Sequence, residues 1–221
     1  MNTQGIVNKL TKLYQEEKFV NDKLGGKVVE IINANFIADR PYLLRAPNED
    51  YVRRELKWYR SQSLNVNSIE GTVPKIWKDV ASDNGYINSN YGWCIYSKEN
   101  QDQYDNVLDT LIADIHSRRA VMIYTRPSMH YDYNSEGKND FMCTNNVQYL
   151  YRDNQLHAIV NMRSNDAVFG YNNDYAWQKF VLDKLVSSLS LFYRFQIIPG
   201  DIHWNVGSLH VYEQHFKELN K

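Results

Sequence analysis

The stretch 140–177 constrains the fold most, because two strands, a tight turn and a long helix follow one another within it. Residues 147–151 and 156–162 are rich in apolar side chains, and the intervening residues 152–155 contain an Asp-Asn pair that suits a tight turn. The second strand ends in a run of Arg, Ser, Asn and Asp, and the longest predicted helix follows at 175–191. We therefore expect a hairpin whose far end gathers polar side chains close to the start of a helix.

The other predicted elements mix along the chain without a regular β-α-β alternation. Further helices are predicted at residues 3–17, 47–61, 74–80, 100–114 and 210–219, and further strands at Lys27–Ile37, 120–124 and 196–206. The polar segments 61–72, 83–92 and 132–138 are predicted to be loops, and residues 21–26 a turn. This order predicts the α+β class, and without repeats or linkers we expect a single domain over residues 1–221.

Composition narrows the functional classes. Twenty-five basic residues against 26 acidic ones give a net charge of −1, whereas proteins that bind nucleic acid through many phosphates usually carry a basic excess. No run approaches the roughly 18 apolar residues of a membrane span, and the N-terminus lacks the apolar core of a signal peptide, so we expect a cytoplasmic protein. Two cysteines exclude a disulfide framework and a Cys-x-x-Cys zinc site, and no metal is expected.

Cys143 lies just before the hairpin and has two interpretations. In most proteins such a thiol is buried and structural. A tight turn, however, places the start of the first strand beside the end of the second, where Arg163 and Ser164 stand. A neighbouring arginine favours the thiolate, which is the nucleophilic form, and a guanidinium can hold a phosphate or carboxylate through two hydrogen bonds.

Several motifs that follow one another along the chain support the interpretation of Cys143 as a nucleophile. The run Arg163-Ser-Asn-Asp166, followed by Gly170 and Asp174, resembles the Arg-Ser-x-Asp motif of the thymidylate synthase family with its later glycine and polar residue. The other segments that resemble family motifs are Lys23 after Asn21-Asp22, Arg54-Glu-Leu-Lys-Trp58, Ser117-Arg118-Arg119 and Gly207-Ser-Leu-His-Val-Tyr212. The resemblance runs from about residue 20 to residue 216. It implies a synthase-like α+β fold: a mixed sheet with helices on one face and a sheet face that forms a homodimer interface.

One departure from the family pattern bears on the substrate. At the position of Asp174 the family's uracil-specific members have an asparagine, which can pair with both the N3–H and the C4 carbonyl of uracil. A carboxyl can accept from the exocyclic amine of cytosine and, when it carries a proton, donate to N3. An ionised carboxylate facing a uracil carbonyl would cost roughly 1–3 kcal/mol. The residue therefore resembles the cytosine-specific branch of the family in bacteriophages, which hydroxymethylates dCMP.

The resemblance implies a mechanism and roles for the matching residues. Cys143 adds to C6 of the ring, Asp174 stabilises the charge that develops at N3 and N4, and C5 then attacks the one-carbon unit of 5,10-methylenetetrahydrofolate. Water completes the product, and Glu55 is the expected general base. The residues implied in substrate binding are Lys23, Arg163, Ser164 and, from a second subunit, Arg118 and Arg119 for the phosphate, His210 and Tyr212 for the sugar, and Asn165. The residues implied in folate binding are Asp166, Trp93 and Gly170.

Several positions depart from the family pattern. The family's Pro-Pro-Cys-His is Phe141-Met-Cys-Thr144 here, so any role of that histidine is absent. Ser208 replaces an aspartate, and Trp93 follows its glycine with two residues fewer than in synthases. The sequence continues only briefly past Phe216, whereas synthases close their C-terminus over the folate. We therefore expect either that the site closes in another way or that it stays wetter, which would favour water as the final reactant.

Two other functions stay open on the sequence. One is an enzyme that acts on dUMP, which Asp174 disfavours. The other is a non-catalytic, synthase-fold component of a complex of nucleotide-precursor enzymes, in the cytoplasm of an infected bacterium. Without the family match, Glu55 on a helix would be interpreted as a solvated charge. His130, His157 and Cys94 have no motif and are expected to be structural.

Overall fold

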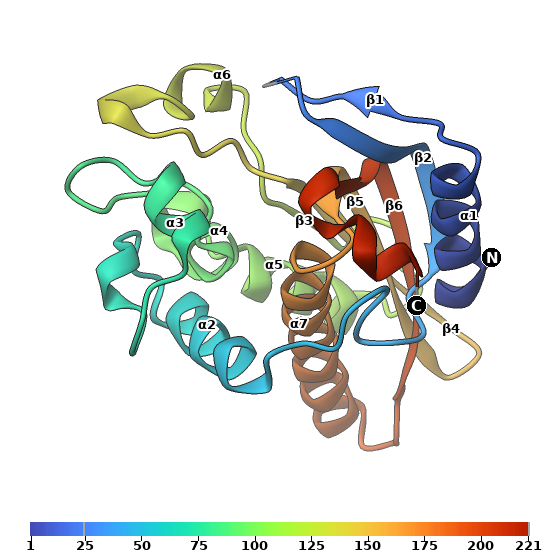
Figure 1. Ribbon diagram of the computed structural model, residues 1–221. Coiled ribbons are helices and arrows are strands. Elements are labelled where there is room, and N and C mark those ends of the chain that lie inside the picture. The colour runs from blue at the N-terminus through green and yellow to red at the C-terminus, as the bar shows by residue number, and fades with distance from the viewer. Residues whose placement is uncertain (24, 221) are drawn as a thin grey trace. The chain divides into compact units, whose positions relative to one another are not determined.

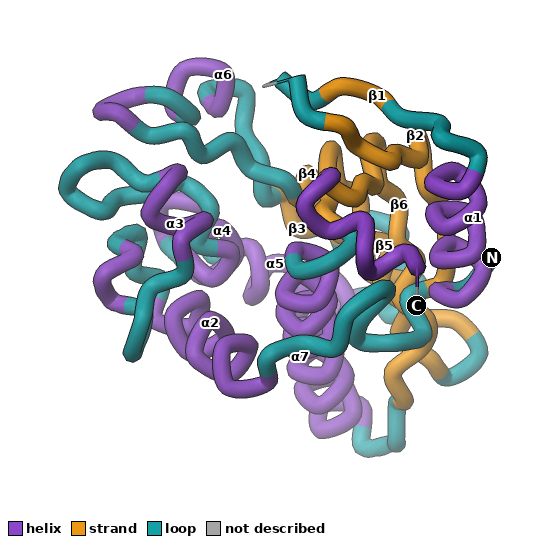
Figure 2. Tube along the Cα trace, in the orientation of Figure 1, coloured by secondary structure: helices purple, strands orange, loops and turns teal. Residues whose placement is uncertain are grey.

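In the computed structural model, which describes residues 1–23 and 25–220, the chain divides into two compact units (Figure 1). The first unit combines Met1–Asn48 with Tyr151–Lys221, and the second spans Glu49–Leu150. The first contains most of the paired strands, and the second contains most of the short helices (Figure 2). No helix among the described residues is long and apolar enough to cross a membrane.

The first unit is built on a mixed sheet in the order β1-β2-β6-β5. Strand β2 (Lys27–Ile37) runs antiparallel to β1 (Val20–Asn21) and to β6 (Ile198–Tyr212), whereas β6 runs parallel to β5 (Gln155–Asp166). Helix α1 (Thr3–Gln15) packs against β2, and the long helix α7 (Gly170–Tyr193) packs against β5 and β6.

Aromatic packing holds α7 on the sheet. Tyr171, in the first turn of α7, lies edge-on to Trp204 of β6 with ring centroids 5.2 Å apart. Phe36 of β2 completes the group, and its ring centroid lies 6.0 Å from that of Tyr171. All three side chains are buried, and each large aromatic ring that leaves water contributes several kcal/mol to the hydrophobic core. The start of α7 is therefore held firmly against the middle of β6 and against β2.

The second unit consists of short elements around two paired strands. Its helices are α2 (Glu49–Ser61), α3 (Lys75–Val80), α4 (Tyr91–Tyr96), α5 (Gln103–Ala113) and α6 (Met129–Asp132), with short 3₁₀ helices at Val66–Ser68, Lys98–Asn100 and Ser135–Gly137. Strand β3 (Val121–Ile123) pairs antiparallel with β4 (Thr144–Arg152).

Helices α2 and α4 touch through their backbones at one point. A side chain at Gly92 would place its Cβ 1.7 Å from the carbonyl oxygen of Tyr59, so only glycine permits this approach. The side chain of Asn90 caps α4 by accepting from the Trp93 N–H at 2.8 Å, and it also donates to the carbonyl of Trp58 at 3.1 Å. The start of α4 is thus tied directly to α2.

Most predicted elements are confirmed, and two predictions were wrong. The turn between β4 and β5 is formed by Asp153 and Asn154, whose φ angles of 50° and 64° fit a tight hairpin turn. The predicted helix at 210–219 is instead the end of β6, followed by a 3₁₀ helix, η4 (Glu213–Asn220), because β2 and β5 pair with that end from both sides.

The predicted loop at 83–92 ends at Asn90, since α4 already begins at Tyr91. Helix α7 begins at Gly170 rather than at Tyr175. Of the predicted turn 21–26, residue 24 lies outside the described part of the chain.

Candidate active site

Glu55 lies in the middle of α2 and its side chain is buried, with 3% of its surface exposed. The Tyr51 hydroxyl, one helical turn earlier, donates a hydrogen bond to Oε1 of Glu55. The indole N–H of Trp77, from α3, lies 2.9 Å from the same oxygen and 2.9 Å from the Tyr51 hydroxyl. Trp58 packs edge-on against Trp77, with ring centroids 5.0 Å apart, and closes the aromatic wall around the carboxyl.

Burial raises the pKa of Glu55 from its ordinary value of 4.5 to about 7, although the hydrogen bonds from Tyr51 and Trp77 lower it. A carboxyl with that pKa is present in both forms near neutral pH, which suits a general acid or base. The interpretation of Glu55 as a solvated charge is therefore wrong: the aromatic side chains of α2 and α3 cover it. The sequence did not indicate a role for Tyr51 or Trp77: the spacing of Tyr51, four residues before Glu55 on α2, could have suggested a contact, whereas no local pattern relates Trp77 of α3 to Glu55.

Cys143 is half-buried and directly precedes β4. Its loop is anchored by Asp140, whose buried carboxylate accepts from the backbone N–H groups of Asn88 at 2.6 Å and Ser89 at 2.8 Å. The Ser89 hydroxyl donates to the other carboxylate oxygen at 2.6 Å. A carboxylate that receives three such hydrogen bonds holds its backbone in one place. The position of the thiol is therefore set by the segment that leads into α4.

A series of contacts connects the Glu55 helix to the residue next to the thiol. Tyr59, on α2, stacks on Tyr91 of α4 with ring centroids 5.2 Å apart. The hydroxyl of Tyr91 accepts a hydrogen bond from Thr144 at 3.0 Å, and Thr144 follows Cys143 directly. Thr144 stands where the family has a histidine, so the threonine here serves to position the strand start.

Trp93 is half-buried on α4, and the guanidinium of Arg126 lies over its ring at 5.7 Å from the centroid. Arg126 also donates from Nε to Asp132 at 2.8 Å, which holds the guanidinium in place. An aromatic ring backed by a fixed cation can present its other face to a flat ligand.

The first unit gathers the polar end of β5 and the start of α7. The amide nitrogen Nδ2 of Asn165, which is buried, donates to Oδ2 of Asp174 at 2.7 Å. Oδ1 of Asn165 accepts from the indole N–H of Trp204 at 3.2 Å. Gly170 lies against this group, since a Cβ there would be 3.3 Å from Cβ of Asp166 and 3.4 Å from Nδ2 of Asn165. Asp174 itself is half-buried within the second turn of α7.

Asp166 caps the start of α7. One carboxylate oxygen accepts from the N–H of Val168 at 3.1 Å, and the other accepts from Phe169 at 3.0 Å and Gly170 at 3.2 Å. An ionised carboxylate offers about four acceptor positions, so these three bonds leave room for another donor.

His210 is paired with Asp166 in the register of β5 and β6 and is buried. Its Nδ1 lies 3.3 Å from the carbonyl of Ser208, so the neutral ring carries its proton there and keeps a lone pair on Nε2. Tyr212 packs edge-on against the ring at 4.8 Å. The Ser208 hydroxyl donates to Glu30 of β2.

The predicted phosphate-binding residues differ in location. Arg163 is exposed on β5, next to the half-buried Ser164. Lys23 is exposed in the turn between β1 and β2, and the pairing of Val28 with Tyr212 places that turn beyond the end of β6. Lys23 and Arg163 are thus both exposed cations of the first unit, one in the turn before β2 and the other near the end of β5. The other two predicted cations, Arg118 and Arg119, are exposed in the second unit just before β3.

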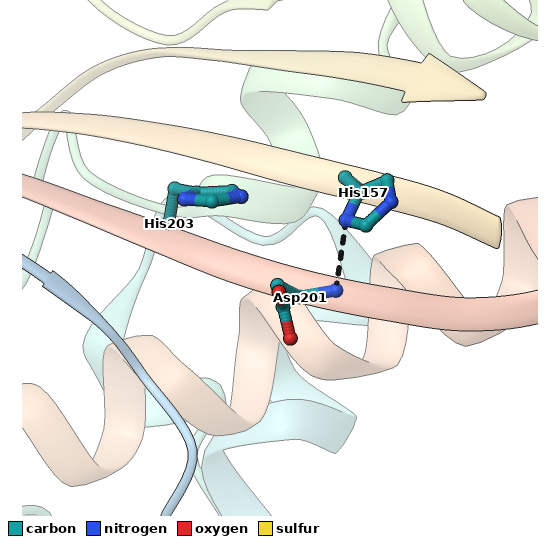
Figure 3. A group of neighbouring side chains, drawn as sticks. All are labelled: His157, Asp201 and His203. Carbon is teal, nitrogen blue, oxygen red and sulfur yellow. Dashed lines mark hydrogen bonds between the residues drawn. The ribbon is translucent and has the colours of Figure 1, made fainter. Parts of the chain in front are cut away.

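The described residues include one group of potential metal ligands, formed by His157, Asp201 and His203 (Figure 3). Their ligand atoms lie within 4.8 Å of one another. Nδ1 of His157, however, accepts from the backbone N–H of Asp201 at 3.0 Å, so the neutral ring carries its proton on Nε2. The group therefore does not offer two imidazole lone pairs to one ion, and it is not the arrangement of a zinc site.

The chain resembles several known proteins in sequence. A sequence profile described as thymidylate synthase matches residues 45–221. Deoxycytidylate 5-hydroxymethyltransferase of Enterobacteria phage T4 is 59% identical over 203 residues, covering 91% of this chain and 82% of that protein, and the phage T6 enzyme of that name gives the same values. Thymidylate synthase of Francisella philomiragia is 25% identical over 180 residues, covering 77% of this chain and 64% of that protein.

A solved structure, thermostable thymidylate synthase A from Bacillus subtilis, superposes with a TM-score of 0.72 at 19% identity and covers 100% of this chain and 83% of its own. At that identity the superposition shows the fold, which is the predicted α+β synthase fold. The profile match and the phage relatives go further: this chain belongs to the thymidylate synthase family.

Proposed function

We propose that this protein transfers a one-carbon unit from 5,10-methylenetetrahydrofolate to C5 of dCMP and adds water, giving 5-hydroxymethyl-dCMP for modified phage DNA. The observation that carries the proposal is Asp174, a half-buried carboxyl held through Oδ2 by Asn165 at the start of α7. A carboxyl can accept from the cytosine amine and donate to N3, a pair of roles that an asparagine would fill for uracil instead. The phage relatives named above carry the same activity in their names.

The chemistry begins with Cys143, whose thiolate adds to C6 and makes C5 nucleophilic. Asp174 stabilises the charge that develops on N3 and N4 during this addition, so it acts in the transition state as well as in binding. C5 takes up the one-carbon unit of the folate and loses its proton as tetrahydrofolate leaves, and water then adds to the resulting exocyclic methylene. The bond from Cys143 to C6 breaks at the end, when the ring regains its double bond and C5 has lost its proton.

Glu55 is the proposed base for the water that completes the product. Its pKa of about 7 means that close to half of the carboxyls are ionised at neutral pH and can accept a proton from water. Trp77 and Tyr51 both donate to Oε1, so they orient the carboxyl and leave Oε2 as the oxygen that can face water. A carboxylate oxygen that is oriented in apolar surroundings would bind and activate a single water more readily than the oxygen of a solvent-exposed carboxylate.

The substrate phosphate is assigned to Lys23, Arg163 and Ser164, with Arg118 and Arg119 reaching it from the second subunit of a homodimer. The exposure of these cations supports this assignment, because exposed ammonium and guanidinium groups are accessible to the oxygens of a phosphate. His210 and Tyr212 are assigned to the sugar hydroxyl. The lone pair on Nε2 of His210 supports that role, since it can accept from a hydroxyl.

The folate is assigned to Trp93, Asp166 and Gly170. The ring of Trp93 offers a stacking face, and the capped carboxylate of Asp166 keeps an acceptor position for a ring N–H. We further propose that residues 1–221 work as a single catalytic domain in the cytoplasm of the infected bacterium, in association with other enzymes of nucleotide-precursor synthesis and without membrane or direct nucleic-acid binding.

Tritium release from C5 tests this function. The protein is incubated with methylenetetrahydrofolate and either [5-³H]dCMP or [5-³H]dUMP, and the nucleotide product is identified by mass. Release from dCMP together with a hydroxymethyl product is expected. Release from dUMP alone would instead identify a uracil-specific enzyme, and release from neither would favour a non-catalytic component of a precursor complex.

A further inference from the structure

Glu30, Ser208 and His210 lie on one face of the sheet of the first unit. In the antiparallel pairing of β2 with β6, Glu30 is directly opposite His210, and residues that stand opposite each other in such a pair project to the same face. Ser208 stands two positions before His210 on β6, so its side chain lies on that face too. His210 is buried, whereas Glu30 and Ser208 are half-buried. A carboxyl, a hydroxyl and an imidazole are therefore neighbours beside the end of β5, where Asp166 pairs with His210.

The hydrogen bonds among these three side chains have one direction. An ionised carboxylate only accepts, so the single proton of the Ser208 hydroxyl is donated to Oε1 of Glu30. The oxygen of that hydroxyl lies 3.4 Å from Nδ1 of His210 and, because its proton is already used, can only accept there. The carbonyl oxygen of Ser208 lies 3.3 Å from the same nitrogen and is also an acceptor. Both polar neighbours of Nδ1 are thus acceptors, so the neutral ring carries its proton on Nδ1.

Glu30 decides this tautomer because a serine hydroxyl can donate as well as accept. Without an acceptor at Glu30, the Ser208 hydroxyl could turn and donate to Nδ1 of His210. The ring would then keep its lone pair on Nδ1 and carry its proton on Nε2. With Glu30 in place, the same rotation would leave the half-buried carboxylate without its hydrogen bond. Glu30 therefore disfavours the Nε2–H form of His210.

We propose that Glu30, acting through Ser208, is a positioning residue that keeps Nε2 of His210 as a hydrogen-bond acceptor for the sugar of the nucleotide. This inference rests on the proposed function, which assigns His210 to the sugar hydroxyl, and adds a residue that no motif indicated. Among the described residues, the side-chain hydrogen bonds of His210 are made through Nδ1, which leaves Nε2 to a ligand. dCMP has one free sugar hydroxyl, at C3′, and Nε2 would accept its proton in a hydrogen bond.

NMR of the whole protein with isotope-labelled histidine tests the first step, because the ring nitrogen and carbon shifts distinguish the two tautomers. His210 of the wild type should be in the Nδ1–H form. Glu30→Leu fills similar space without an acceptor oxygen, so a large part of His210 should convert to the Nε2–H form. In the double variant Glu30→Leu/Ser208→Ala the competing hydroxyl is gone, while the backbone carbonyl at position 208 remains. The Nδ1–H form should therefore return, which is a rescue that simple structural damage would not produce.

Tritium release from dCMP and from 2′,3′-dideoxy-CMP, which lacks the sugar hydroxyl, tests the second step. Glu30→Leu should raise the KM for dCMP about 2-fold to 10-fold, the size of one neutral hydrogen bond. Its kcat should change little, because the sugar contact is made equally in the ground state and the transition state. The KM for the dideoxynucleotide should equal that of the wild type, and the double variant should regain the wild-type KM for dCMP.

Asp39→Asn is the matched control, since the Asp39 carboxylate also accepts from a hydroxyl, that of Thr3, outside the His210 group. It should leave the His210 tautomer and both KM values unchanged. A wild-type His210 in the Nε2–H form, or a Glu30→Leu protein whose KM rises equally for both nucleotides, would overturn the inference. So would a double variant that behaves no better than Glu30→Leu. A wild-type protein that releases no tritium from dCMP would overturn the proposed function instead, and the histidine spectra would still decide whether Glu30 sets the tautomer.

Discussion

Removing the Tyr51 hydroxyl should shift the pH dependence of the reaction by a predictable amount. Burial raises the pKa of Glu55 to about 7, and the hydrogen bond from Tyr51 is the largest effect that opposes it. A hydrogen bond to a charged group contributes about 1.5–3 kcal/mol, and 1.36 kcal/mol corresponds to one pKa unit. In Tyr51→Phe the pKa of Glu55 should therefore rise by about one to two units. The ionised fraction at pH 7 would fall from about a half to about a tenth or less.

The assay is kcat/KM for hydroxymethyl-dCMP formation between pH 5.5 and 9.5, because this parameter reports the pKa values of the free enzyme. The acidic limb of the wild type should have its midpoint near the Glu55 value of about 7. In Tyr51→Phe that midpoint should move upward, with activity about fivefold lower or more at pH 7 and largely recovered at high pH.

Tyr149→Phe provides the control for this prediction. The Tyr149 hydroxyl is buried and has no hydrogen-bond partner among the described residues, so its removal should leave the acidic limb in place. A wild-type midpoint near the ordinary carboxyl value, or the same midpoint in Tyr51→Phe, would refute Glu55 as the titrating base.

Glu55 should also make the fold less stable at high pH. Its folded pKa of about 7 lies above the ordinary value of 4.5, so the folded state binds the proton more tightly than the unfolded state does. The contribution of Glu55 to the free energy of unfolding is therefore fully present below about pH 4.5. It is lost as the pH rises through 7, and the loss amounts to roughly 3 kcal/mol. Glu55→Gln should match the wild type in urea unfolding at pH 4.5 and exceed it at pH 8. Equal stability of the two proteins at pH 8 would contradict a strongly raised pKa.

Three further predictions concern single residues. Cys143→Ser should abolish turnover, because an alkoxide is far harder to generate than a thiolate at neutral pH. The variant should still bind dCMP, so its turnover and its dCMP binding would both be measured on one gel-filtered sample. Asp174→Asn should move the preference from dCMP toward dUMP by about 10-fold to 100-fold, and full retention of the dCMP preference would contradict the role of the carboxyl. Gly92→Ala should destabilise the protein by about 1–3 kcal/mol or more in thermal unfolding, since its Cβ would meet the carbonyl oxygen of Tyr59 at 1.7 Å.

Local patterns in the sequence were sufficient where an element is determined by its own residues. The β-branched run at Lys27–Ile37 forms β2 with the predicted bounds, and the Asp153-Asn154 pair forms the predicted turn because these side chains tolerate positive φ. The ordered motifs also indicated the family, which the profile match confirms.

Elements that depend on neighbours were the ones predicted incorrectly. Residues 210–212 could continue a strand or begin a helix, and the choice was made by pairing with Val28 on β2 and Asp166 on β5. Helix α4 was missed because six residues rarely carry a helical period, and it depends on the Asn90 cap and on contact with α2.

The sequence by itself determined which chemical groups this protein has and which family it belongs to, since both depend on residue identity and order. Only the tertiary structure decided the state of those groups. Glu55 becomes a carboxyl with a pKa of about 7 because tertiary packing buries it, an effect that the hydrogen bonds from Tyr51 and Trp77 only partly offset. Asn165 lies between Asp174, to which it donates at 2.7 Å, and Trp204, from which it accepts at 3.2 Å, because the fold brings β6 and the start of α7 beside the end of β5. Burial and hydrogen-bond direction arise from contacts between distant segments, and no local pattern encodes them.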